Sequence, residues 1–220
     1  MTNSTKPKLG IIALTLELYE TLAPGVREDR EKWLRDIVVK KLGQHVDVEF
    51  RNAVFTKTEI EQEINRLEQA NADAICVVFL TYDPSQIVLP ALKNSKRPLL
   101  IWNIQDLFGV DENYNGELLI GNHGVHGTQD PANVLLRCEV DFEYVTTHIN
   151  DPDSCKAVTD FCFAASTKRK IASSRFGIMG KEFPGMGDFA FDATQWRVLS
   201  GIFNSGPDEY IRRYIISTPR

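Results

Sequence analysis

The sequence lacks a hydrophobic run long enough to cross a membrane. A spanning helix needs roughly 20 consecutive apolar residues, and no run in the 220-residue chain approaches that length. The first residues are mostly polar and include Lys6 and Lys8, which is unlike a secretory signal. We therefore expect a globular, cytoplasmic protein without a membrane partner.

Basic charge is also scarce. The chain has 25 Lys and Arg residues against 30 Asp and Glu residues, so its formal net charge is -5. A generic nucleic-acid binder needs a basic face that contacts phosphates, and no such face is evident in the sequence. We expect no nucleic-acid partner, and the acidic balance is ordinary for a soluble enzyme.

Cysteine is sparse and scattered. The four cysteines are Cys76, Cys138, Cys155 and Cys162. None of them has the close pairing of a zinc or redox motif. A reducing compartment fits them best, and we expect buried free thiols.

The common nucleotide and hydrolase motifs are missing. The first expected strand runs out through residues 15–20, which lack the glycines of a Rossmann dinucleotide site. Gly180, Gly185 and Gly187 follow a later strand, but no Lys-Ser or Lys-Thr pair comes next as a P-loop requires. The chain also has no Gly-x-Ser-x-Gly elbow.

Alternating apolar and amphipathic runs are the main positive signal. The apolar runs predict strands at residues 9–16, 46–50, 74–80, 98–103 and 142–146. Residues 27–42 and 58–70 have apolar side chains near helical spacing. Strands this apolar are typical of a parallel sheet that is covered on both faces. We predict an α/β fold, a Rossmann-like (flavodoxin-like) parallel sheet with helices on both faces.

Two Asp-Pro pairs predict helix starts, with Asp as N-cap and Pro in the first helical position. They are Asp83-Pro84 and Asp151-Pro152, and a helix over residues 152–170 would close a first domain at 1–172. A strand at 175–179, a loop at 180–187 and a mainly helical segment at 189–203 would begin a second α/β domain at 173–220. That stretch is short for a domain, so we expect a truncated chain.

The run from residue 119 to 127 carries half of the histidines. It reads Leu119, Ile120, Gly121, Asn122, His123, Gly124, Val125, His126, Gly127. It precedes an amphipathic segment at 129–137, which places both imidazoles on a glycine-rich connection. Glycine lets such a backbone take positive φ and bend closely around a ligand or a neighbouring chain, and histidine can donate, accept or ligate near neutral pH.

The expected ligand site lies beyond the carboxyl ends of the strands, where ligands bind in open α/β sheets. Segments 17–19, 103–126 and 183–188 fall there. The second is long enough to suggest a functional, structureless loop.

Several segments, in their order along the chain, resemble the L-arabinose isomerase and L-fucose isomerase superfamily. They are Glu17-Leu18-Tyr19, Tyr82-Asp83-Pro84 and residues 98–105, 122–127, 145–151 and 185–192. The resemblance implies conversion of an aldose to a ketose through an enediol, with a divalent metal, usually manganese (Mn2+), holding two sugar oxygens. Such a metal polarises the carbonyl.

The resemblance also assigns roles to individual residues. Leu18 and Tyr19 would border the sugar site, and Met186 would line it. His123 and His126 would reach into a neighbouring subunit's site, which implies a homo-oligomer. The arabinose enzymes commonly carry glutamine at the place of His123, so a fucose-isomerase-like member with an unassigned sugar fits better. The family's metal ligands and catalytic carboxylates would lie outside this chain, so we expect the 220-residue chain alone to have no isomerase activity.

Alternatives stay open at this point. The chain is either the amino-terminal part of such an isomerase or a non-catalytic sugar-binding or regulatory α/β module. The histidines could bond a sugar, form half a metal site or only hold their own loop together. Tyr19 and Met186 could be packing residues.

Overall fold

The computed structural model describes residues 6–177, 184–187, 192–200 and 203–205. The chain divides into two compact units, Met1–Ser166 and Thr167–Arg220.

The first unit is built on a parallel sheet, as predicted. Its strands are β1 (Lys8–Leu14), β2 (Asp47–Glu49), β3 (Ala53–Val54), β4 (Ala74–Phe79), β5 (Leu99–Gln105) and β6 (Phe142–His148). The strand order is β2-β1-β4-β5-β6, with β3 also paired to β1, and every pairing is parallel. The five apolar runs all form strands. The sequence analysis missed only β3 among the strands of this sheet.

One edge of the sheet is interrupted. The strand β2 pairs with the start of β1, where Lys8 lies opposite Asp47. The strand β3 pairs with the end of β1, where Leu14 lies opposite Val54. Two short strands therefore share one side of β1, separated by the chain at 50–52.

Helices connect the strands. They are α1 (Glu17–Leu22), α2 (Val26–Trp33), the π-helical turn η1 (Leu34–Val39), α3 (Lys40–Leu42), α4 (Lys57–Gln69), α5 (Ser85–Lys93), α6 (Gly116–Gly121), α7 (Gly124–Arg137) and α8 (Lys156–Ala172). The α2–η1–α3 run and α4 confirm the two predicted helices. Thr56 and Glu59 form a reciprocal capping box at the start of α4, which explains its sharp start.

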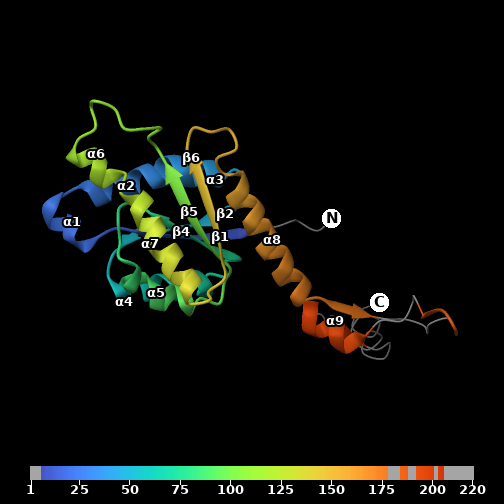
Figure 1. Ribbon diagram of the computed structural model, residues 1–220. Coiled ribbons are helices and arrows are strands. Elements are labelled where there is room, and N and C mark those ends of the chain that lie inside the picture. The colour runs from blue at the N-terminus through green and yellow to red at the C-terminus, as the bar shows by residue number, and fades with distance from the viewer. Residues whose placement is uncertain (1–5, 178–183, 188–191, 201–202, 206–220) are drawn as a thin grey trace, which may run out of the picture. The chain divides into compact units, whose positions relative to one another are not determined.

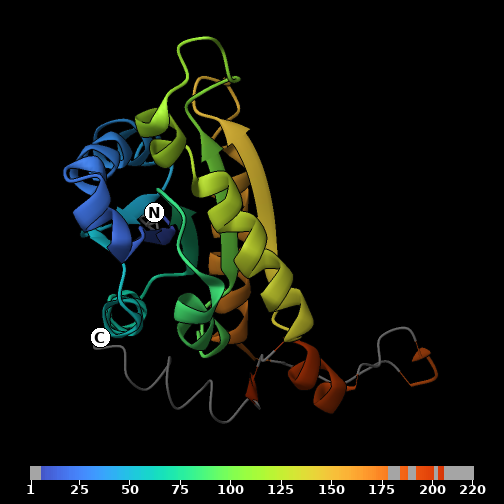
Figure 2. The ribbon, with the colours of Figure 1, turned by 60° about the vertical axis from the view of Figure 1, so that its left-hand side comes forward.

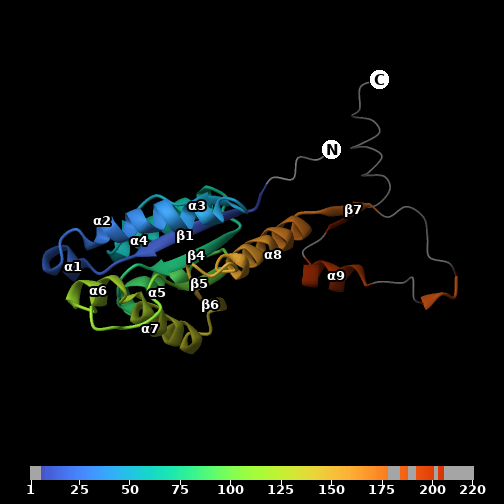
Figure 3. The same ribbon diagram turned by 90° about the horizontal axis from the view of Figure 1, so that it is seen from above.

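Two apolar cores cover the two faces of the sheet. Leu9, Ile11 and Ala13 of β1 pack with residues of η1, α3 and α8. Ile12 and Leu14 pack with residues of α4, α5 and α7. Figure 3 shows α2 and α3 on one side of the strands and α5 and α7 on the other. Burial on both faces is why the central strands β1, β4 and β5 are apolar at almost every position.

The helix caps predicted for the two Asp-Pro pairs are wrong, although α5 begins within one residue of its predicted start. Helix α5 begins at Ser85, and the Ser85 N–H donates to Oδ2 of Asp130, 2.9 Å away, rather than to Asp83. Helix α8 begins only at Lys156. Asp151 instead accepts a bond from the His148 N–H at 3.3 Å, within the turn that precedes the helix.

The connections diverge between β1 and β4. The chain leaves β1 over the face that carries η1 and α3, whereas it leaves β4 and β5 over the face that carries α5 and α7. Figure 1 shows α1 and α6 beyond the same edge of the strands. Such a divergence point is where open α/β sheets bind ligands.

The second unit has a two-stranded parallel sheet. The strand β7 (Arg175–Gly177) pairs with β8 (Phe203–Ser205), and α9 (Ala193–Ser200) lies between them in the sequence. The predicted strand at 175–179 and the helical segment at 189–203 lie partly outside the described residues. Within the described part of the chain, no helix combines the length and apolar character needed to cross a membrane.

Candidate functional site

The histidine segment is not a glycine-rich connection, contrary to the prediction. Helix α6 ends at Gly121, His123 immediately precedes α7, and His126 lies in the first turn of α7. The predicted structureless loop at 103–126 likewise contains α6. Among the described glycines, only Gly25 and Gly185 have positive φ, so the segment does not bend in the way that glycine content suggested.

The glycines of α7 serve close packing instead. A Cβ atom at Gly124 would lie under 3.0 Å from the carbonyl oxygen of Phe79. A Cβ atom at Gly127 would lie 2.8 Å from the carbonyl oxygen of Thr81. Only glycine lets the helix rest directly on the end of β4, and this contact places His123 beside the divergence point of the sheet.

Four aromatic side chains gather there, and we call them the Tyr–His cluster: Tyr19, Tyr82, His123 and His126. The Tyr19 hydroxyl and Nδ1 of His123 are hydrogen-bonded at 2.8 Å. The ring centroid of His123 lies 5.5 Å from that of Tyr82 and 4.8 Å from that of His126, which it meets edge-on. The cluster joins the connections that follow β1, β4 and β5.

The cluster is accessible, and its Tyr19–His123 pair is uncharged. Tyr19, Tyr82 and His123 are half-buried, and His126 is exposed. Burial lowers the pKa of His123, and the neighbouring His126 lowers it further. Burial also raises the pKa of Tyr19. The Tyr19–His123 pair is therefore neutral near pH 7.

Asp130 binds Tyr82 of the cluster and the start of α5. Its Oδ2 accepts a bond from the Tyr82 hydroxyl at 3.3 Å as well as the bond from Ser85. Burial, followed by the Asp130 charge, raises the pKa of Tyr82. Sequence reasoning gave no role to Asp130 and treated Tyr82 only as part of a resemblance. Tyr82 follows β4 as Tyr19 follows β1, and this equivalent position could have identified Tyr82 from the sequence.

A buried carboxyl group lies next to the cluster in the sequence. Asp83 has no exposed surface, and neither of its oxygens has a hydrogen-bond partner within the described residues. This burial raises the pKa of Asp83 to about 8. The sequence analysis assigned the residue to a helix cap, because Asp before Pro gives no local sign of burial.

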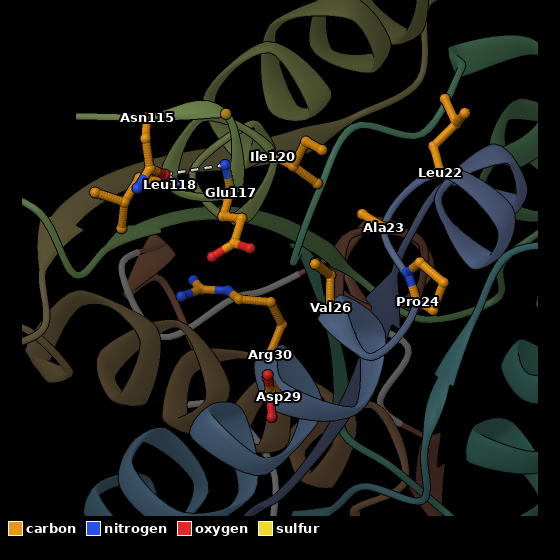
Figure 4. Close-up of a pocket in the computed structure, with 12 residues that line it drawn as sticks. Leu22, Ala23, Pro24, Val26, Asp29, Arg30, Asn115, Glu117, Leu118 and Ile120 are labelled. Atoms are coloured by element: carbon orange, nitrogen blue, oxygen red, sulfur yellow. Dashed lines mark hydrogen bonds between the residues drawn. The ribbon is translucent and has the colours of Figure 1, made fainter.

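A pocket of about 880 Å³ lies between α1–α2 and α6. Its walls include Leu22, Pro24 and Ile120, and Figure 4 shows Arg30 and Glu117 pointing toward each other. Arg30 pairs with Asp106 and stacks on Trp33, with its guanidinium carbon 4.3 Å from the ring centroid. Figure 2 shows α6 beside α1 and α2. Sequence reasoning did not identify this pocket.

The remaining predicted site residues are exposed. Leu18 is 55% exposed on α1, next to Tyr19 in the sequence. Met186 is 42% exposed and belongs to the second unit. Within the first unit, the structure therefore brings together Tyr19, His123 and His126.

The cluster does not fit a catalytic metal. The described residues include no group of three or more His, Cys, Asp or Glu side chains that could hold an ion, and His123 and His126 supply only two nitrogen donors. A catalytic site needs about three protein ligands. The Tyr–His cluster alone therefore does not supply a manganese site.

No protein-family model matches the chain, and no curated protein matches it. The assignment to the arabinose and fucose isomerases therefore rests on the sequence resemblance alone.

Proposed function

We propose that the chain is part of a metal-dependent aldose–ketose isomerase of carbohydrate metabolism, to which it contributes a sugar-binding surface and subunit contacts. The observation that supports this proposal is the 2.8 Å hydrogen bond between Tyr19 and His123. The resemblance assigns both residues to sugar sites, and the fold unites them at the divergence point of the sheet, where ligands bind.

The chemistry of the cluster suits a neutral polyol. Sugar hydroxyls both donate and accept hydrogen bonds, and so do the Tyr hydroxyl and the neutral imidazole. The rings of Tyr19 and Tyr82 add apolar surface for the C–H face of a sugar. No fixed positive charge belongs to the cluster, which favours an uncharged ligand over a phosphate or a carboxylate.

The Tyr19–His123 hydrogen bond differs from what the resemblance implies. The resemblance divides these residues between two sites, with Tyr19 in the chain's own site and His123 and His126 in a neighbour's site. The fold pairs Tyr19 and His123 within one chain. We propose that one sugar contacts both, that the exposed His126 faces the neighbouring subunit, and that manganese ligands come from outside the described residues.

The proposed subunit contact includes exposed leucines near the pocket. Leu18, Leu22, Leu118 and Leu119 are between 38% and 64% exposed on α1 and α6. A concentration of apolar side chains on a surface is typical of an interaction site. All four cysteines are free thiols, which agrees with a reducing compartment, and we propose the cytoplasm as the site of action.

Saturation-transfer NMR with L-fucose and L-arabinose tests the sugar proposal. We expect saturable binding by the wild type, weakened about fivefold in Tyr19→Phe, because one hydrogen bond contributes about 1 kcal/mol. Tyr144→Phe is the matched control, since it removes a hydroxyl that bonds Thr128 elsewhere on the chain. Equal binding by both variants, or no binding at all, would contradict the proposal.

A second readout separates the isomerase from a non-catalytic sugar-binding module. Ketose formation is measured with and without added Mn2+, using the protein at the full length at which it occurs in its source. Metal-dependent turnover supports the isomerase, whereas sugar binding without turnover supports the module.

A further inference from the structure

The pocket between α1–α2 and α6 has no part in the proposed sugar binding. It shares α1 and α6 with the Tyr–His cluster, but none of the four cluster residues lines it. Its volume of about 880 Å³ lies within the range that is typical of ligand sites. Such sites are mostly apolar, and a few polar groups fix the orientation of the ligand.

The apolar part of the wall comes from two sides. Leu22, Pro24 and Val26 line the pocket at the junction of α1 and α2, and Ile120 lines it from α6. Each CH₂ group of a ligand that is buried against this wall should strengthen binding about fourfold. The wall therefore favours a ligand with a large apolar group.

Arg30 of α2 brings unpartnered hydrogen-bond donors to the pocket. Its Nη1 donates to Oδ2 of Asp106, and its guanidinium group stacks on Trp33. Within the described residues, Nε and Nη2 have no hydrogen-bond partner, although the side chain is only 15% exposed. Asp106 and Trp33 thus hold a guanidinium group that can still donate, and a carboxylate is the acceptor that best fits its planar geometry.

Glu117 of α6 carries the opposite charge. Its carboxylate points toward Arg30 (Figure 4), and Asp29 is a second acidic residue of the lining. In the part of the chain that the structure describes, neither of these carboxylates forms an ion pair. Because Asp106 already neutralises Arg30, the negative charges are in excess. A ligand that carries only negative charge is disfavoured, whereas an ammonium group beside Glu117 is favoured.

We propose that this pocket binds an α-amino acid with a large apolar side chain. The carboxylate of the ligand accepts from Arg30, and its ammonium group donates to Glu117. Its side chain lies against the apolar wall. Two opposite charges that face each other without pairing match the two opposite charges on the α-carbon of an amino acid. The inference goes beyond the proposed function and does not depend on sugar binding.

Calorimetric titration of the 220-residue protein with L-phenylalanine provides the test. We expect saturable binding. Phenethylamine lacks the carboxylate and 3-phenylpropionate lacks the ammonium group. Each should bind about tenfold more weakly, as is usual when a hydrogen bond between charged groups is lost. Glycine lacks the apolar side chain and should show no measurable binding.

The variant Glu117→Gln tests the contact with the ammonium group. In the wild type, L-phenylalanine should bind about tenfold more tightly than 3-phenylpropionate, whereas in Glu117→Gln this ratio should fall to about twofold. Glu112→Gln is the matched control, because Glu112 is an exposed glutamate of the same β5–α7 connection that does not line the pocket. It should keep the tenfold ratio.

Three results would overturn the inference. If phenethylamine binds as tightly as L-phenylalanine, Arg30 does not bind the ligand carboxylate. If the ratio is the same in Glu117→Gln and Glu112→Gln, Glu117 does not bind the ammonium group. Absence of L-phenylalanine binding is the third result. Binding of L-fucose is measured separately, so this inference and the proposed function can fail independently.

Discussion

Two neighbouring regions at the carboxyl edge of the sheet differ in how tightly they are packed. Where α7 begins, Gly124 and Gly127 press against backbone carbonyls of β4 and its end, and Asp83 is fully buried. Where α6 faces α1 and α2, a pocket of about 880 Å³ is open, and Leu22 is 64% exposed. The same connection, from β5 to α7, forms part of both regions.

This difference shows that the type of a residue does not reveal whether it serves close packing or ligand binding. Gly121 and Gly124 belong to one short motif, yet a Cβ at Gly121 would meet only the side chain of Arg30, 3.8 Å away. His123 lies at the boundary between the two regions, and this position gives it both a fixed backbone and an accessible ring.

The strongest test of the tight region is Gly124→Ala. The added methyl would overlap the carbonyl oxygen of Phe79, and a backbone atom in a central strand has little room to move. We expect a loss of about 3 kcal/mol in the free energy of unfolding, at the upper end of overpacking costs. Urea denaturation measures it.

Gly121→Ala is the matched control in the loose region. It ends α6 without positive φ, and alanine favours a helix over glycine by up to about 1 kcal/mol. We therefore expect an unchanged or slightly higher stability. Similar destabilisation by the two substitutions would contradict the difference in packing between the two regions.

The buried carboxyl group gives a pH-dependent test. The folded-state pKa of Asp83 is raised to about 8 from an ordinary value of 3.8, so the folded state binds the extra proton. The contribution of this carboxyl group to the free energy of unfolding is fully present below about pH 4, and it is lost as the pH rises toward 8. The Asp83→Asn side chain stays neutral. As the pH rises through this range, the free energy of unfolding of the variant should therefore increase relative to that of the wild type by about 1.4 kcal/mol per pH unit.

Unfolding measured from about pH 5.5 to about pH 7 should therefore shift the difference between the two proteins by about 2 kcal/mol. Asp47→Asn, at an exposed position, is the control and should show no such shift. A constant difference between Asp83→Asn and the wild type would mean that the carboxyl group is solvated.

The smallest effect on stability is expected in the loose region. Leu22→Ser and Leu118→Ser alter exposed side chains, so each should change the free energy of unfolding by less than about 0.5 kcal/mol. Their effect should appear in light scattering after gel filtration, as a shift to smaller assemblies. If the mass of the assemblies is unchanged, these leucines do not form the proposed subunit contact.

The fold was largely predictable because burial on two faces leaves a strong sequence signal. Continuous apolar runs marked the central strands β1, β4 and β5. The short β3 has only Ala53 and Val54, too few residues for any pattern. The Asp-Pro starts failed because the partner of the Ser85 N–H is Asp130, 45 residues away, which no local motif can indicate.

The candidate site was less predictable, for the same physical reason. Glycine disfavours a helix locally, so the start of α7 looked like a loop. Contact with β4 outweighs that preference, and it is visible only in three dimensions. Tyr19 and His123 were both singled out, but their hydrogen bond spans 104 residues, and the sequence analysis placed them in different subunits' sites.

The interrupted edge formed by β2 and β3 has a consequence for aggregation. A foreign strand approaching this side would find three residues of β2 and then two of β3, too short a template for a growing fibril. The other edge strand, β6, offers seven residues in one run. Misassembly through strand pairing should therefore begin at β6, where a lysine on the outer edge would oppose it.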